Sequence, residues 1–170
     1  MGKGSSILGI IGILLGAGGL GFGFIAWNNQ NTMQASLAAQ DIWYQYDGDV
    51  FTVNPIDTYL QIPNMSIVFD LASTTSIHML FVCRAIILPN PTDYVGISLY
   101  FNVDGIRLPQ PRVDVGSFEG SSTSDYYSVA LQHFIPSFSS GTHNISVMVY
   151  SEGTPNSVWY CSLSIQSFTD

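Results

Sequence analysis

The sequence predicts a mainly β protein, with a single N-terminal transmembrane α-helix and a short helical stalk followed by an antiparallel β-sandwich or jelly roll. Three observations predict it. Residues 7–27 contain only apolar residues and glycine, and residues 28–46 contain neither proline nor glycine. Beyond them, short runs rich in β-branched and aromatic residues alternate with turn clusters, which is typical of all-β domains. The expected domains are an N-terminal anchor at 1–27, a stalk at 28–46 and an external head at 47–170.

The acidic net charge of the chain limits the kinds of molecule that it can bind. Only 9% of the residues are charged, and 4 Lys+Arg stand against 12 Asp+Glu, for a net charge of -8. Proteins that bind nucleic acid neutralise phosphates with Lys and Arg, and this chain has no basic surface to do so. We therefore expect no nucleic-acid partner.

The apolar segment has the length of a membrane span. Its residues 7–27 would extend about 31 Å as a helix at ~1.5 Å per residue, which matches the hydrocarbon core of a bilayer. A signal peptide is the alternative, but it would have a shorter apolar region and a small-residue cleavage site, and a pilin-type leader cut after Gly4 is another. We expect an uncleaved anchor in a lipid bilayer. Lys3 is the nearest cation, so the N-terminus lies inside and the head outside.

Glycines in the anchor form a helix-packing seam. They recur at alternating spacings of three and four residues, and the same register continues into the stalk: Gly9, Gly12, Gly16, Gly19, Gly23, Ala26, Gln30, Met33, Leu37, Gln40 and Tyr44. Small residues let membrane helices approach closely, and a 3.5-residue repeat implies left-handed supercoiling. We expect a parallel bundle of more than two helices, because Gly18 and Gly21 lie off the seam. The GxGxxG pattern at 16–21 lies inside this span without a preceding strand, so it predicts no dinucleotide site.

A glycine-rich apolar N-terminus before a polar helix also resembles the fusion peptide of viral fusion proteins. The same residues serve a static anchor equally well. Because anchors are far commoner, the anchor is the first hypothesis and the fusion protein the alternative.

The head is expected to contain about eight strands. Asp104-Gly105 should close a tight hairpin, because both residues tolerate positive φ. The expected strands are 50–53, 59–62, 66–71, 76–88, 94–103, 126–134, 142–151 and 157–168.

Most of these strands alternate apolar and polar residues, which indicates one buried face. The run 77–88 differs because both of its faces are mostly apolar. We expect Met79, Phe81 and Cys83 in the monomer core. The other face, with Leu80, Val82 and Ile86, is either covered within the sandwich or in contact with a neighbouring subunit, and the helix bundle upstream favours the subunit contact.

Several head residues have predicted structural roles. Cys83 and Cys161 should both point inward, as a disulfide or as buried free thiols. Asn64 and Asn144 begin Asn-x-Ser sequons and could be N-glycosylated in a host that glycosylates exported proteins. Arg84, in an apolar strand, is expected to need a carboxylate partner.

The sequence predicts no enzyme, cofactor or metal site. His78, His133 and His143 lie in different predicted elements without a zinc-ligand spacing. The segment 116–120 lacks the central serine of GxSxG. Asp47-Gly48-Asp49 lacks the remaining oxygen ligands of a calcium loop and is better explained as a turn.

The C-terminal part resembles a known family. The hairpin at Val103-Asp104-Gly105, the run 138–147 (FSSGTHNISV) and the closing run 159–165 (WYCSLSI) are similar to the last strands of trimeric jelly rolls of the tumour-necrosis-factor/C1q type. Similar heads occur in viral and phage receptor-binding proteins. The resemblance covers about the last 70 residues and implies a homotrimer packed through its strand faces, with recognition by loops at the membrane-distal end.

The resulting hypothesis is a non-enzymatic, single-pass surface protein: a spike or attachment protein of a virion, of an archaeal virus by expectation. The argument for a virion is compactness, with a few residues inside, one span and one head. Expected partners are the bilayer, copies of the chain in a homotrimer or alternatively a pentamer, other envelope or capsid proteins and a host-surface receptor. A cellular adhesin or pilus-like subunit is a further alternative.

Overall fold

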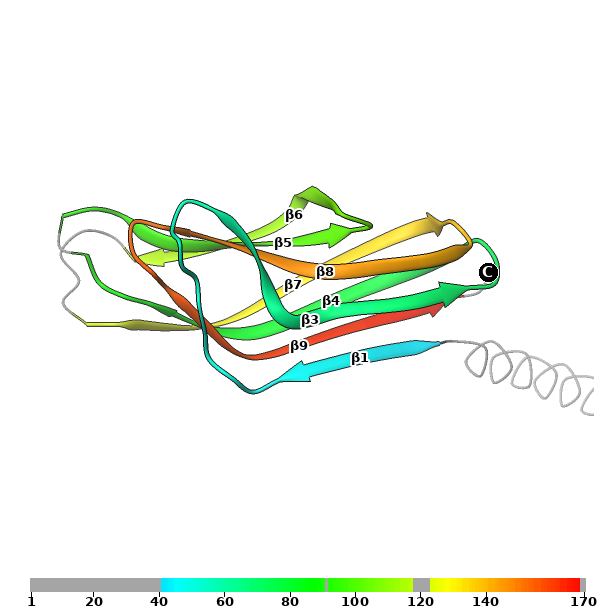
Figure 1. Ribbon diagram of the computed structural model, residues 1–170, viewed down its shortest axis with the longest axis horizontal. Coiled ribbons are helices and arrows are strands. Elements are labelled where there is room, and N and C mark those ends of the chain that lie inside the picture. The colour runs from blue at the N-terminus through cyan, green and yellow to red at the C-terminus, as the bar shows by residue number, and fades with distance from the viewer. Residues whose placement is uncertain (1–40, 91, 118–122, 169–170) are drawn as a thin grey trace, which may run out of the picture. The chain divides into compact units, whose positions relative to one another are not determined.

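The computed structural model describes residues 41–90, 92–117 and 123–168 (Figure 1). The predicted anchor, its glycine seam and the stalk as far as Gln40 lie outside the described residues, and the chain divides into two units between Gln40 and Asp41. In the part that the structure describes, no helix is long and apolar enough to span a membrane. That part contains nine strands: β1 (Ile42–Asp47), β2 (Phe51–Thr52), β3 (Tyr59–Leu71), β4 (Thr75–Ile87), β5 (Val95–Val103), β6 (Ile106–Ser117), β7 (Asp125–Phe138), β8 (Gly141–Glu152) and β9 (Ser157–Phe168).

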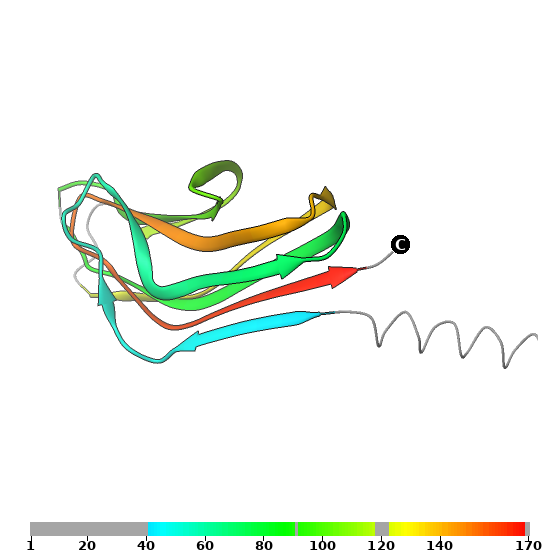
Figure 2. The ribbon, with the colours of Figure 1, turned by 45° about the vertical axis from the view of Figure 1, so that its right-hand side comes forward.

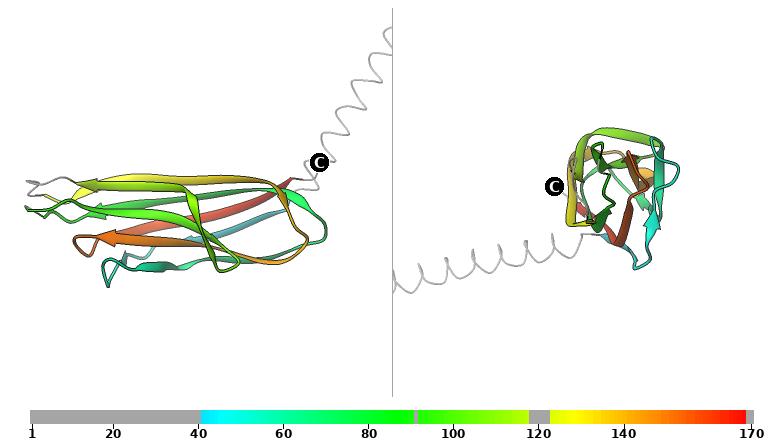
Figure 3. Two further views of the ribbon diagram at one scale, coloured as in Figure 1. Left: turned by 90° about the horizontal axis from the view of Figure 1, so that it is seen from above. Right: turned by 90° about the vertical axis from the view of Figure 1, so that its left-hand side faces the viewer.

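The strands form two antiparallel sheets that face each other across one core (Figure 3). The first sheet has the order β1-β9-β4-β7, with β2 also paired to β9, and the second has the order β3-β8-β5-β6. Except for the β5–β6 hairpin, each successive connection from β3 to β9 crosses from one sheet to the other. This order is that of a jelly roll, which is the mainly β antiparallel head predicted from the sequence.

The core is made by alternate residues of both sheets. Phe81 from the first sheet and Phe101 from the second are fully buried, as are Ile97, Leu99 and Ile145. On β5 and β8 the alternate residues Val95, Ile97, Leu99, Phe101, Ile145, Val147 and Val149 are buried, so the prediction of one buried face is confirmed for these strands. Each strand buries one side because successive side chains point to opposite faces.

Residues 42–46 are a strand and not the end of a helical stalk, so that part of the stalk prediction is wrong. β1 pairs with β9 from Ile42↔Gln166 to Asp47↔Cys161 (Figure 2). The run Ile42-Trp43-Tyr44 combines β-branched and aromatic residues, which favour strands. Pairing here also covers the edge of β9, which would otherwise expose its backbone groups.

Two further differences concern the second sheet. β6 follows the hairpin where the sequence indicates a turn-rich stretch. Its Pro109 and Pro111 lie where the β5–β6 register shifts, between the pairs Tyr100↔Arg112 and Asn102↔Arg107. β6 is also the edge strand of its sheet, and prolines in sheets are confined to edges and bulges. The two strands expected at 59–62 and 66–71 are one strand with an irregularity between Gln61 and Ser66.

The predicted hairpin turn is confirmed. Asp104 and Gly105 have φ values of 50° and 84° between β5 and β6. Positive φ at both central residues is the requirement of the tight turn that suits right-twisted strands.

Candidate functional site

The most distinctive surface of the head is the outward side of the first sheet, here called the outer face. The strand register places its side chains in rows that run from β1 across β9 and β4 to β7. One row is Tyr44, Ser164, Leu80 and Gln132, and the next is Tyr46, Ser162, Val82 and Ala130. The set comprises Ile42, Tyr44, Tyr46, His78, Leu80, Val82, Arg84, Ile86, Tyr126, Ser128, Ala130, Gln132, Phe134, Trp159, Ser162, Ser164, Gln166 and Phe168.

This outer face exposes large apolar groups. Ile42 is 66% exposed, Tyr126 60% and Phe134 51%. Between these margins, the centre carries small side chains such as Ser162 and Ala130 beside Val82. Single exposed apolar residues are normal on a soluble protein, whereas a contiguous patch of this kind marks an interaction surface.

Arg84 is the one charged side chain in the outer-face set. It stands over the ring of Trp159, with its guanidinium carbon 5.7 Å from the ring centroid. Among the described residues it forms no ion pair with a carboxylate, which corrects the expectation from the sequence. The reason is that this side of β4 is open to solvent, so the cation keeps its hydration and needs no buried counter-ion.

Part of this outer face was predicted correctly from the sequence. Leu80, Val82 and Ile86 share one side of β4, opposite to the buried Met79, Phe81 and Cys83. Val82 is exposed, and Leu80 and Ile86 are half-buried. Their role at a subunit contact stays a prediction.

The sequence reasoning missed the contributions of β1 and β7 to the outer face. Ile42, Tyr44 and Tyr46 were expected on a helix. Tyr126 and Phe134 lie on β7, whose alternation with Ser128, Ala130 and Gln132 was a usable signal.

Cys83 and Cys161 both point into the core, as predicted, and both are free thiols. The hydrogen bond between the two thiols, together with burial, raises the pKa of Cys83. A neutral buried thiol is a poor nucleophile because the thiolate is the reactive form.

We therefore expect the folded protein to resist alkylation. A membrane-impermeant maleimide should label neither cysteine in native buffer near pH 8, and both should react after denaturation without reductant. Mass spectrometry distinguishes the outcomes. A denatured chain that stays unlabelled and is lighter by two hydrogens would establish a disulfide instead.

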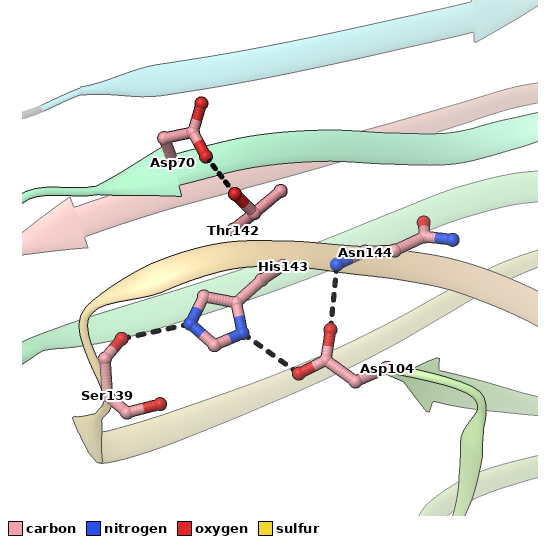
Figure 4. Close-up of polar contacts among 6 residues, drawn as sticks. All are labelled: Asp70, Asp104, Ser139, Thr142, His143 and Asn144. Carbon is pink, nitrogen blue, oxygen red and sulfur yellow. Dashed lines mark hydrogen bonds and ion pairs between the residues drawn. The ribbon is translucent and has the colours of Figure 1, made fainter.

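The side chain of His143, near the start of β8, connects the β5–β6 turn at Asp104 to the β7–β8 turn at Ser139 (Figure 4). Its Nε2 lies 3.0 Å from the carbonyl oxygen of Ser139, to which it donates, and its Nδ1 lies 2.8 Å from the Oδ2 of Asp104. Asp104 also accepts a 2.8 Å hydrogen bond from the backbone N–H of Asn144. The buried ring packs against Phe138 with centroids 4.3 Å apart. This cluster is structural, since both ring nitrogens are engaged within the chain.

The cluster makes stability depend on pH through Asp104. Partial burial acts to raise the pKa of Asp104, but the hydrogen bonds from Asn144 and His143 outweigh it and the pKa is lowered. A carboxyl with a lowered folded pKa stabilises the fold above its unfolded pKa of about 3.9, and this contribution is lost as pH falls through the folded value.

We expect Asp104→Asn to lower the free energy of unfolding by about 1 kcal/mol at neutral pH, the size of one hydrogen bond at a half-exposed site. Asparagine tolerates the positive φ found here, so the turn is retained. The difference from wild type, measured by urea denaturation, should shrink toward pH 3. Asp70→Asn is the control. A deficit that is constant with pH would contradict a role for the carboxylate charge.

The sequon asparagines are both exposed. Asn64, with φ 58°, donates a 2.9 Å hydrogen bond from its amide to Asp47, and Asn144 accepts a 2.7 Å hydrogen bond from the hydroxyl of Ser66. Their glycosylation stays a prediction. In the described ranges, no group of three or more His, Cys, Asp or Glu side chains could hold a metal ion.

The strand order and the uncovered outer face define the class of protein, a jelly-roll head with an apolar sheet surface. No family model matches the sequence, and no curated protein matches it. Solved structures with a similar fold include the VP2 subviral particle of infectious bursal disease virus, at 13% identity and a TM-score of 0.45, covering 76% of this chain and 33% of that one. The chain thus spans about a third of the VP2 chain.

Two further structures are similar. The tumour necrosis factor Eiger from S. frugiperda is 9% identical, with a TM-score of 0.46, and the match covers 76% of this chain and 94% of that one. Dimeric latent PorU from Porphyromonas gingivalis is 10% identical, with a TM-score of 0.45, covering 77% of this chain and 13% of that one. The fold is that implied by the resemblance of the C-terminal strands, and its assignment rests on the strand order.

Proposed function

We propose that this chain is a non-enzymatic structural protein of a virion surface, anchored in the membrane through residues 7–27 and assembled into homo-oligomeric spikes whose heads serve attachment to the host. The observation that carries the proposal is the outer face of the first sheet. It exposes aliphatic and aromatic side chains at its margins around a centre of small side chains, and a head standing alone would leave them in water.

A second copy of the chain is the partner that suits this surface best. The centre of small side chains around Val82 allows a close approach, and the margin of Ile42, Tyr44, Tyr126 and Phe134 supplies the aromatic and aliphatic groups that interfaces favour. Because Arg84 is the one charged side chain of the outer face, this surface provides little electrostatic attraction for a charged partner. The predicted glycine seam would hold copies side by side, which raises the effective concentration of the heads.

A static anchor is favoured over a fusion peptide by the pairing of β1. The strand that follows the predicted anchor is hydrogen-bonded to β9 along its whole length, and Asp41 adds two bonds of 3.0 Å to Ser167, one from its N–H and one to its carbonyl oxygen. A fusion protein must release its N-terminal segment toward a second membrane. A refolding of the head that frees this strand would have to break the ladder.

The test is to locate the head on intact particles. Enveloped virions should be labelled on the outside by an antibody against the head, and cryo-electron tomography should resolve regular multimeric projections at the labelled positions. External protease should remove the head while the N-terminus stays protected. Extraction of the chain from the particle by alkaline carbonate, or labelling only after membrane permeabilisation, would refute the proposal.

A further inference from the structure

The second sheet carries a hollow of about 350 Å³ on its own outward side, on the opposite side of the head from the outer face. The register brings Tyr59, Tyr150, Ser98 and Asp114 into one row across β3, β8, β5 and β6. The adjacent row contributes Glu152 of β8 and two paired glycines, Gly96 and Gly116. The floor of the hollow is therefore built on four strands.

Tyr94 forms one wall because the paired glycines make room for it. A Cβ at Gly116 would lie 2.3 Å from the Tyr94 hydroxyl oxygen, and one at Gly96 would lie 2.7 Å from the same atom. Any larger residue at either position would displace the tyrosine. Burial first, and then the charges of Asp114 and Glu152, raise the pKa of Tyr94.

The opposite wall is a fixed aromatic cluster. The Tyr59 ring lies 4.9 Å from that of Tyr150 and 5.5 Å from that of Tyr100. Arg107 stands over both Tyr59 and Tyr100, at 3.9 Å and 4.8 Å from the ring centroids. The hydroxyl of Tyr150 donates to the carboxylate of Asp57 at 3.2 Å. Rings held in this way lose little conformational freedom on binding.

The base of the hollow presents donors and acceptors that are already oriented. Arg112 donates from Nε to the Oδ2 of Asp114 at 2.7 Å, and Ser98 donates to the other oxygen of that carboxylate at 2.5 Å. The remaining guanidinium N–H groups of Arg112 and the carboxylate of Glu152 add further donors and acceptors. The two positive charges of Arg107 and Arg112 nearly balance the three negative charges of Asp57, Asp114 and Glu152.

We propose that this hollow binds a neutral saccharide of one or two rings. Sugar hydroxyls both donate and accept hydrogen bonds, which matches the mixture of donors and acceptors in the hollow. The C–H faces of a sugar ring also pack against tyrosine rings. An anion would meet the two carboxylates, and a cationic ligand would meet Arg107 on the faces of Tyr59 and Tyr100. The volume lies at the lower end of the range for small-molecule sites. The proposal is independent of the anchor and of self-association, because one chain supplies the whole hollow.

The test uses the full-length chain in a detergent without a sugar headgroup. It is applied to an array of immobilised neutral, sialylated and sulfated oligosaccharides, and it is titrated in solution with free neutral methyl glycosides and with choline. Binding of neutral glycans on the array identifies a surface glycan as the source, and binding of the methyl glycosides alone identifies a free sugar. Either result supports the proposal. Binding confined to acidic glycans or to choline, or no binding of any probe at millimolar concentration, overturns it.

Variants assign the binding to this hollow. Asp114→Asn removes the charged acceptor and should weaken binding about tenfold or more, while Asp70→Asn, on the same side of the same sheet but away from the hollow, should leave it unchanged. Glu152→Gln and Ser98→Ala give the same readout if Asp114→Asn does not fold, as judged by circular dichroism. Neutral-glycan binding that survives all three hollow variants would refute this location.

Discussion

Val82→Asp should convert the head from an oligomer into a folded monomer. Val82 lies near the centre of the outer face, between Ser162 and Ala130, and is 38% exposed in the single chain. If copies pack through this surface, the substitution places an unpaired carboxylate in a desolvated contact. Such a buried charge costs about 3–5 kcal/mol, so association should weaken by roughly a hundredfold or more.

The measurement is the mass by light scattering of a fragment that begins at Asp41, over a range of concentrations. The control is Val68→Asp, the same change at a valine that is 66% exposed on the outward side of the second sheet. It should leave the oligomer intact. Circular dichroism must show unchanged β content in both variants. Equal masses for the wild type and Val82→Asp, whether both oligomeric or both monomeric, would show that the heads do not associate through this surface.

The parts of the fold that were predictable follow from local alternation. In β5, and in residues 145–149 of β8, every second residue is aliphatic or aromatic. Burial of one face is the dominant free-energy term, so these core residues could be assigned from sequence alone. The hairpin at Asp104-Gly105 depends only on the tolerance of two residues for positive φ. Neither inference needs knowledge of a distant partner.

β1 and β6 were not predictable in the same way, because long-range pairing decides them. The good helix formers upstream of Ile42 extend a helical pattern into a segment that β9 then recruits as a strand. β6 contains two prolines, which argue against a strand until its position at the sheet edge is known. In both segments the tertiary context overrides the local signal.

The same reason explains why one of the two proposed interaction surfaces could be anticipated from the sequence and the other could not. Leu80, Val82 and Ile86 lie within one strand, where a period of two places them on one side. The hollow assembles Tyr59, Tyr94 and Asp114 with residues of β8, far apart in the chain. Only the register of four strands brings them together, and no spacing within the sequence encodes that register.

Removing β1 should destabilise the head more than any change to its surface. β1 shields the edge of β9 along six residue pairs, and Trp43 packs on Phe69 of the other sheet with ring centroids 4.6 Å apart. Loss of a packed tryptophan costs about 3–5 kcal/mol.

For a domain of this size, such a loss corresponds to a fall in Tm of roughly 10–20 °C. The comparison is between fragments that begin at Asp41 and at Gly48, melted at a concentration where both are monomeric. Tyr44→Ser in the longer fragment is the matched control. It removes an exposed aromatic group of the same strand and keeps the ladder, so its Tm should stay within a few degrees of the parent.

The shorter fragment should also aggregate on standing, because the exposed edge of β9 offers unpaired backbone groups to other chains. If the two fragments have the same Tm, β1 contributes nothing to the stability of the head. The domain boundary at residue 46 that the helical pattern predicts would then be correct.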